Sequence, residues 1–180
     1  MRSTLLDPAA PPTKAVDLGA PRSESVAPMT VVARLEPDAL DPQKELAALT
    51  ADARGAGAIV TFVGLARARS KHGAAVESLV LDHHSRLTQQ SLDRIATECI
   101  ARFEVTHVRV VHRCGAVGAD EPIVFAGAAS LHRRAAFEAA DYLMDRLKTE
   151  AVFWKREVGQ EGSTWIEPTE ADHVDRERWD

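Results

Sequence analysis

The stretch LKTEAVFWKRE, residues 147–157, is where a long helix gives way to a strand. Upstream, apolar residues recur at helical spacing from Phe137 to Leu147, which predicts a helix that begins near Arg133. Downstream, residues 152–158 alternate in polarity as a strand does, and a turn then leads into a second short strand at 164–166. We therefore predict a β-hairpin directly after the longest helix of the chain.

The rest of the folded part alternates between helical and strand patterns. A helix should begin at Pro42, with Asp41 as its N-cap, and end at Gly55. Because helices are interspersed with adjacent strand pairs, we expect an α+β fold with antiparallel pairing and not a doubly wound parallel sheet. The other expected elements are an apolar run at 30–35, strands at 58–63, 76–83, 105–113 and 123–129, and a helix at 88–103.

Length and composition indicate one globular domain. The chain has 180 residues, 45% of them hydrophobic, and no apolar stretch approaches the roughly 20 residues that cross a bilayer. We interpret the proline-rich residues 1–29 as a disordered tail, residues 30–180 as the folded domain, and residues 167–180 within it as an acidic peripheral tail. With no secretory signal and only two cysteines, the expected compartment is the cytoplasm.

Charge is distributed unevenly along the chain. The net charge is −5 and only 5% of residues are aromatic, so neither a nucleic-acid surface nor a membrane surface is expected. Residues 58–156 are nevertheless basic, with fourteen positive and eleven negative side chains. The first basic cluster is the loop at residues 64–73, which contains Arg67. This pattern favours a local anion site, although a solvated charged face has the same composition.

A second basic cluster, Ser130 to Arg134, lies where a strand hands over to the N-terminus of the long helix. Free backbone N–H groups, the positive end of the helix dipole, His132 and Arg133 together would bind a phosphate. Alternatively, the two arginines pair with Glu138 and Asp141 along the helix. The spacing alone does not separate these two interpretations.

Lysine is scarce in this chain, with five lysines against seventeen arginines, yet Lys148 and Lys155 flank Phe153 and Trp154. A lysine near other cations can lose its proton and act as an acid, base or nucleophile, whereas a lysine at a helix C-terminus can also be structural. We expect no metal site and no cofactor, because the adjacent His83 and His84 of a strand would point to opposite faces.

Three stretches resemble the catalytic, large subunit of molybdopterin synthase. They are GAIVTFVGLAR at 57–67, SLHR at 130–133 and, most specifically, LKTEAVFWKRE at 147–157. The resemblance implies an α/β hammerhead-like fold with an additional small antiparallel β-sheet. It also implies a homodimer within a heterotetramer that includes two copies of a small ubiquitin-like sulfur carrier. The implied reaction transfers sulfur from the carrier's C-terminal thiocarboxylate to cyclic pyranopterin monophosphate, which forms the dithiolene of molybdopterin.

The same resemblance implies roles for six residues. Lys148 would be the catalytic acid/base or a transient covalent partner, and Lys155 would orient the thiocarboxylate or stabilise developing charge. The carrier's tail would run along the strand that contains Phe153 and Trp154, with extended backbone pairing. The residues implied to bind substrate are Arg67, His132, Arg133 and Arg156. For Arg156, a surface ion pair with Glu157 or Glu150 is an equal alternative.

Some positions depart from the usual pattern of the family. Ala116 and Val117 replace an acidic and aromatic pair, His84 replaces a tyrosine, and Thr164 and Thr169 stand where arginine is common. Two other functions remain open. One is a non-catalytic carrier-binding protein that kept the fold, and the other is an unrelated anion-binding enzyme with His132 as its base.

Overall fold

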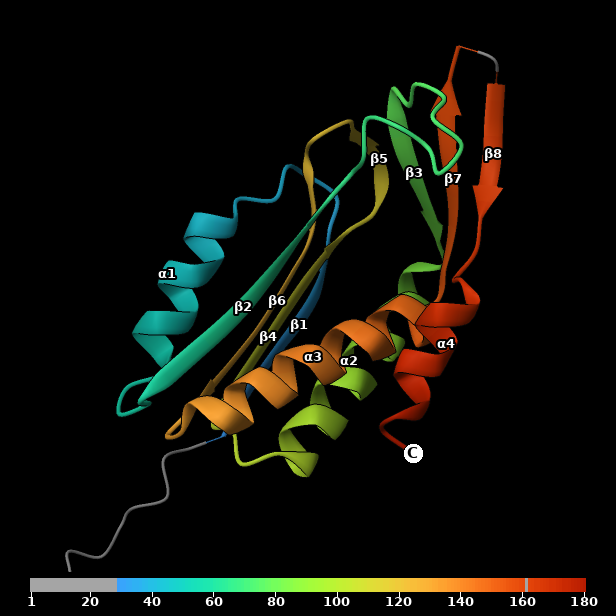
Figure 1. Cartoon of the computed structure of the whole chain (residues 1–180). Coiled ribbons are helices and arrows are strands. Elements are labelled where there is room, and N and C mark those ends of the chain that lie inside the picture. The colour runs from blue at the N-terminus through green and yellow to red at the C-terminus, as the bar shows by residue number, and fades with distance from the viewer. Residues whose placement is uncertain (1–28, 161) are drawn as a thin grey trace, which may run out of the picture.

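The computed structural model describes residues 29–160 and 162–180, so most of the predicted N-terminal tail lies outside the described residues. Two β-sheets meet at an angle and are flanked by helices (Figure 1). The strands are β1 Thr30–Glu36, β2 Ala58–Leu65, β3 Ser78–His83, β4 His107–Arg113, β5 Gly115–Gly118, β6 Pro122–Ser130, β7 Phe153–Gly159 and β8 Gly162–Ile166; the helices are α1 Pro42–Asp52, α2 Ser85–Arg102, α3 Arg133–Glu150 and α4 Glu170–Glu177.

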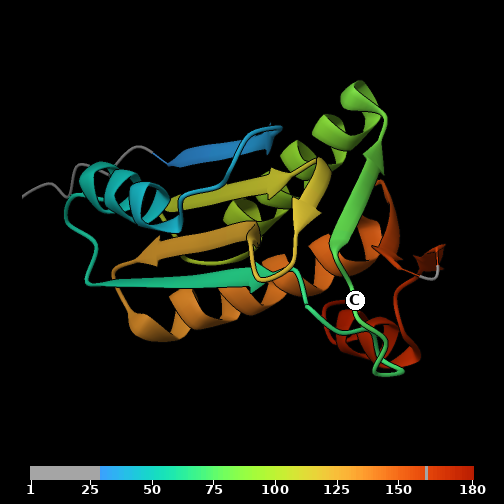
Figure 2. The same cartoon turned by 90° about the horizontal axis from the view of Figure 1, so that it is seen from above.

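The first sheet has the strand order β1-β4-β6-β2. β1 and β4 are parallel, whereas β6 is antiparallel to both β4 and β2. Helices α2 and α3 lie side by side against one face, and α1 lies on the other side (Figure 2). Leu92, Ile95 and Leu143 of these two helices are fully buried against the sheet. Burial of such side chains contributes roughly 1.5–3 kcal/mol each.

The second sheet has the order β5-β3-β7-β8, and all of its pairs are antiparallel. Leu79, Leu81 and Val117 of this sheet form a small core with Ala66, which follows β2, and Phe153 packs against it. This core ties the end of β2 to the second sheet. The consequence is that the loop after β2 and the start of β7 share one region of the molecule.

The predicted α+β class and the additional antiparallel sheet are confirmed, and so is the hairpin after the long helix. Two local predictions were incomplete. The turn-rich segment after β4 contains β5, which pairs with β3, and the pair β1–β4 is parallel. A turn and a short strand can have the same local sequence pattern. Whether such a segment forms a strand, and in which direction it pairs, depends on the strands beside it in the fold.

The C-terminal segment differs from the predicted peripheral tail. Residues 170–177 form α4, which begins with a capping box between Thr169 and Asp172 and packs against α3. Trp179 stacks edge-on with Phe103 and Tyr142 at centroid distances of 5.7 and 5.6 Å. Acidic composition suggested exposure, but ion pairs and this aromatic cluster hold the segment in place. None of the helices among the described residues has the length and apolar character to cross a membrane.

Candidate active site

The turn between α3 and β7 brings the two lysines of the sequence motif together. After α3 ends, Ala151 adopts an extended conformation and the chain enters β7 two residues later. The backbone of Val152 is fixed by α2, because Thr88 Oγ1 donates to its carbonyl at 2.6 Å and its N–H donates to Ser91 Oγ at 3.2 Å. Thr88 and Ser91 are buried. These two hydroxyls therefore set where β7 starts relative to the end of α3.

This arrangement makes a prediction for Thr88→Val. Valine keeps the shape of threonine but leaves the partly buried Val152 carbonyl without a donor, which costs about 1–3 kcal/mol. We expect a lower denaturant midpoint with unchanged slope, together with reduced turnover because the lysines shift. Exposed Thr97→Val on the same helix is the matched control. Equal stability of the two variants would show that the hydroxyl does not fix the turn.

Lys155 lies on β7, an inner strand of the second sheet, and pairs with Leu81 of β3. Burial, together with the nearby charge of Lys148, lowers the pKa of Lys155 to about 8, and the charge of Asp172 partly opposes this. His112 of β4 is close by and stacks on Phe153 at 4.3 Å. Burial and the charge of Lys155 lower the pKa of His112 to about 3, so this ring is neutral at physiological pH. Lys155 is thus a cation that can give up its proton near neutrality.

Lys148 occupies the last turn of α3, and half of its side chain is exposed. Its Nζ lies 3.4 Å from Oδ1 of Asp172 on α4. Burial raises the pKa of Asp172, but hydrogen bonds from Thr169 and the charge of Lys148 lower it below its usual value. A carboxylate that the sequence analysis did not include is therefore the third charged member of this centre. We call Lys148, Lys155 and Asp172 the lysine centre.

Arg67 lies in the loop after β2, and its side chain is exposed. The preceding residue, Ala66, is buried against Leu81, the β3 residue that pairs with Lys155. Among the described residues, Arg67 makes no ion pair. The loop that contains Arg67 is therefore packed at its start against the second sheet, while the Arg67 side chain itself is exposed.

His132 and Arg133 lie at the opposite end of α3 from Lys148. Fifteen residues separate Arg133 from Lys148, and at 1.5 Å per residue this is about 22 Å. His132 is the N-cap residue and its side chain makes no capping bond, while the first turn contains no acidic residue. The described residues offer Arg133 no ion-pair partner, whereas Arg134 pairs with Glu138 at 2.7 Å. The alternative interpretation, an ion pair along the helix, is therefore correct for Arg134 but not for Arg133.

A cavity of about 570 Å³ opens at this helix N-terminus. Gly57 belongs to its wall, and a side chain at this position would collide with the backbone oxygen of Leu131. The N–H of His132 is held by Ser130 Oγ at 3.2 Å. The residues lining the cavity are Gly57, Leu131, His132, Arg133, Arg134 and Phe137.

Arg156 is not brought to the lysine centre. Neighbouring residues of a strand face opposite sides, so Arg156 points away from the side of Lys155. Its Nε donates to Asp82 at 3.1 Å, and its guanidinium lies 5.9 Å from the ring of Trp165. Its ion-pair partner is thus Asp82, and not Glu157 or Glu150.

The expected backbone pairing along the Phe153 and Trp154 strand does not fit the sheet. β7 is an inner strand that pairs with β3 on one side and β8 on the other. Its N–H and C=O groups are used within the sheet, so an incoming peptide cannot add to it. The edges that remain open in this sheet are those of β5 and β8.

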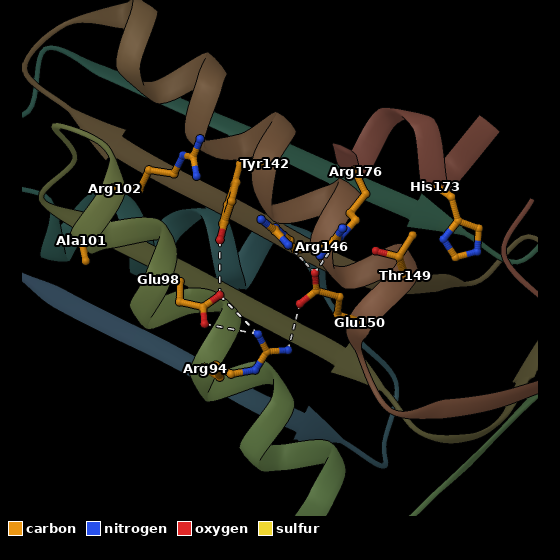
Figure 3. A pocket seen from close by; sticks show the side chains of 10 residues that line it. All are labelled: Arg94, Glu98, Ala101, Arg102, Tyr142, Arg146, Thr149, Glu150, His173 and Arg176. Carbon is orange, nitrogen blue, oxygen red and sulfur yellow. Dashed lines mark hydrogen bonds and ion pairs between the residues drawn. The ribbon is translucent and has the colours of Figure 1, made fainter. Parts of the chain in front are cut away.

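A second cavity, of about 720 Å³, lies between α2, α3 and α4 and contains none of the predicted site residues. Glu150 stands at its centre and accepts from Arg94, Arg146 and Arg176 (Figure 3). Burial alone would raise the pKa of Glu150, but these hydrogen bonds lower it to about 2. Because its charges pair with one another, we assign this cavity to the docking of α4.

Four residues of the site region escaped the sequence analysis: Thr88, Ser91, His112 and Asp172. Thr88 and Ser91 follow the apolar period of α2, which is a weak signal for buried hydroxyls. Thr169 followed by Asp172 is a capping-box pattern that could have predicted α4. The described residues contain no cluster of three or more potential metal ligands.

Comparisons with known proteins identify the family to which this fold belongs. The family model described as MoaE protein matches residues 35–150. The molybdopterin synthase catalytic subunit of Caulobacter vibrioides is 43% identical over 150 residues, which are 83% of this chain and 98% of the relative. The solved molybdopterin biosynthesis MoaE protein of Burkholderia ambifaria has a TM-score of 0.69 and 34% identity, over 84% of this chain and 97% of that one.

A more distant structure is described as a complex of subunits 1 and 2 of the molybdopterin-converting factor of Helicobacter pylori. It has a TM-score of 0.60 and 18% identity, over 77% of this chain and 89% of that one, and it shows the fold alone. Together the fold and the relatives define a sulfurtransferase catalytic subunit. The chain belongs to the MoaE family, the molybdopterin synthase catalytic subunits of molybdenum cofactor biosynthesis.

Proposed function

We propose that this chain transfers sulfur from the C-terminal thiocarboxylate of a small carrier protein to cyclic pyranopterin monophosphate, which yields the dithiolene of molybdopterin. The observation that carries this proposal is the lysine centre, where a mostly buried Lys155 lies near Lys148. Both the thiocarboxylate and the cyclic phosphate are anions, and they need a cationic site within an acidic protein. The cytoplasm is the proposed location, since Cys99 and Cys114 are both buried and unpaired.

In the proposed mechanism Lys148 moves protons and Lys155 stabilises negative charge. Each transfer forms a C–S bond to a substrate carbon while a carbonyl or phosphate-ester C–O bond breaks, and water then cleaves the carrier's acyl–sulfur bond, which releases the carrier as a carboxylate. The departing oxygens need a proton donor, and the exposed Lys148 Nζ can reach them. Lys155 is fixed by its strand and desolvated, so its charge acts strongly on an adjacent thiocarboxylate. Arg67 would bind the substrate's anionic end beside them.

The distance between the two ends of α3 supports a site built from two copies of the chain. His132 and Arg133 cannot reach a substrate at Lys148 of the same chain across about 22 Å. A homodimer resolves this if a second copy places its His132 and Arg133 beside the lysine centre. Such isologous pairing would create two equivalent sites per dimer.

Strand β2 is the edge best suited to join the two copies. It is one of the two edge strands of the first sheet, the other being β1, and it exposes Phe62, Val63 and Leu65. Antiparallel pairing of β2 with itself about a point between Thr61 and Phe62 would set Gly57 of one copy opposite Ala66 of the other. Gly57 lines the His132 cavity and Ala66 precedes Arg67, so the two halves of the site would meet.

The proposed partner is the small ubiquitin-like carrier, two copies of which would complete a heterotetramer. The complex described for the distant Helicobacter pylori structure supports a second, separate subunit for this fold. Trp154 and Trp165 are exposed on the face of β7 and β8 that lies opposite the Lys155 side chain, and they offer an aromatic surface to the carrier. The carrier's extended tail would approach along the open edge of β8 and not along β7.

Reconstitution tests the proposed function. Purified chain, thiocarboxylated carrier and cyclic pyranopterin monophosphate should produce molybdopterin, detected as its fluorescent oxidised derivative. Carrier binding without product would favour a non-catalytic carrier-binding protein. No carrier binding would favour an unrelated anion-binding enzyme with His132 as base, and either result would contradict the proposal.

Arg133→Ala tests the phosphate end of the site. Loss of one charge-assisted contact should raise KM for the pterin about tenfold or more, with carrier affinity unchanged. Arg134→Ala is the matched control, because its guanidinium already pairs with Glu138. Equal effects of both variants on KM, measured by steady-state kinetics, would mean that general charge and not a specific contact is responsible.

A further inference from the structure

Asp172 uses both of its carboxylate oxygens in different contacts. Oδ2 accepts from the backbone N–H and the hydroxyl of Thr169, each at 2.7 Å. Oδ1 faces Lys148 Nζ at 3.4 Å. The same carboxylate therefore caps the N-terminus of α4 and forms an ion pair with Lys148 at the end of α3.

The position of α4 is fixed independently of this pair. Arg176 donates to Glu150 at 3.0 Å, and Arg178 donates to Asp145 at 2.6 Å. The indole N–H of Trp179 also donates to Asp145 at 2.6 Å. Asp172 thus presents its Oδ1 from a segment that is anchored to Asp145 and Glu150, on either side of Lys148 in the last turns of α3.

We propose that Asp172 is a positioning residue of the lysine centre, which uses the α4 capping box to hold the Lys148 ammonium group beside Lys155. This inference rests on the proposed function for its catalytic meaning, but its geometry stands on the described contacts. An exposed lysine samples many rotamers, and a fixed carboxylate restricts them. Asp172 is not itself a catalytic residue, because it acts through Lys148.

The charges around the centre explain why a carboxylate is needed there. Lys155 from β7 and Lys148 from α3 repel each other, and Asp172 from α4 offsets this repulsion. His112 from β4 faces Lys155 as a neutral ring and contributes no charge. Removal of the Asp172 charge should therefore make the Lys155 ammonium group lose its proton at lower pH.

The test combines lysine labelling with turnover in full-length Asp172→Asn. Asparagine keeps the size and can still accept from Thr169, so the cap is retained while the charge is lost. Competitive acylation with acetic anhydride between pH 6 and 11, followed by mass spectrometry of the peptides that contain Lys148 and Lys155, measures each lysine directly. We expect the labelling midpoint of Lys155 to fall by about 0.5 pH unit or more below the wild-type value.

Two variants serve as controls. Asp175→Asn makes the same charge change on α4 at a side chain without a described contact to either lysine, and it should leave both midpoints unchanged. Asp172→Glu restores the charge and should restore the midpoint of Lys155. In turnover assays, the alkaline limb of kcat/KM should move to lower pH in Asp172→Asn and remain in place in Asp175→Asn.

Unchanged labelling midpoints in Asp172→Asn would overturn the inference, whether or not the wild type makes molybdopterin. Equal shifts in Asp172→Asn and Asp175→Asn would also overturn it, since the net charge of α4 would then explain the result. Failure of the wild type to form product concerns the proposed function alone. Lysine labelling therefore tests the role of Asp172, and product formation by the wild type tests the proposed function.

Discussion

Lys148→Ala should lower turnover by about 10² or more while the chain remains folded and binds the carrier. The expected loss is that of a positioned proton-transfer group. Half of the Lys148 side chain is exposed and its described ion pair is with Asp172, so the effect on unfolding should stay within about 0.5–1 kcal/mol. Single-turnover kinetics with thiocarboxylated carrier would measure the chemical step separately from product release.

Two comparisons sharpen this result. Lys148→Arg keeps the positive charge but cannot release a proton at accessible pH, so it should be as inactive as Lys148→Ala. Lys44→Ala removes an exposed lysine of α1 and should have wild-type turnover. Full activity of Lys148→Arg would leave charge, and not proton transfer, as the role of this position.

Lys155→Met should be almost as inactive, yet more stable than the wild type at pH 7. The loss of a fixed, desolvated charge next to the thiocarboxylate should cost about 10² in turnover. Stability should increase because a mostly buried ammonium group is replaced by an apolar chain of similar length. A gain in stability with a loss of activity is typical of a residue kept for function.

The pH dependence of this difference follows from the lowered pKa. Lys155 has a pKa of about 8 in the folded chain, whereas an unburied lysine has a pKa of 10.5. Between these two pH values the unfolded chain therefore binds more protons than the folded chain. Wild-type stability should therefore rise with pH across this window relative to Lys155→Met. Thermal denaturation at pH 7 and pH 10 checks this: a smaller difference at pH 10 is expected, and a larger one would contradict the burial of a charged lysine. Wild-type turnover should fall above about pH 8 as Lys155 loses its charge.

Local patterns were sufficient to predict most elements of the fold. The period that ends at Leu147 is a strong signal because one face of α3 is buried, although Phe137 at its start is exposed. The alternation after Val152 is a strong signal because the residues of β7 are partly buried and Phe153 packs against a core. Pro42 after Asp41 likewise marked the start of α1. These features depend on neighbours in the sequence and need no knowledge of tertiary contacts.

Local sequence patterns could not predict which of the site residues lie close together in the fold. His132 and Lys148 belong to one helix and one motif set, yet the length of α3 separates them. Asp172 reaches Lys148 only because Glu150 and Asp145 anchor α4, an arrangement that involves residues far apart in the chain. The acidic composition of residues 167–180 gave no sign of these contacts with α3.

The most direct test of a lysine centre completed by a second copy is a hybrid dimer. One copy has Lys148→Ala and the other has the double change His132→Ala and Arg133→Ala; two different affinity tags allow purification of the hybrid alone. If each site combines the lysines of one copy with His132 and Arg133 of the other, one of the two sites is intact and the hybrid should have about half of the wild-type turnover. Both parent homodimers should be nearly inactive. A hybrid as inactive as its parents would contradict the account, because it would mean that all of these residues act within one chain.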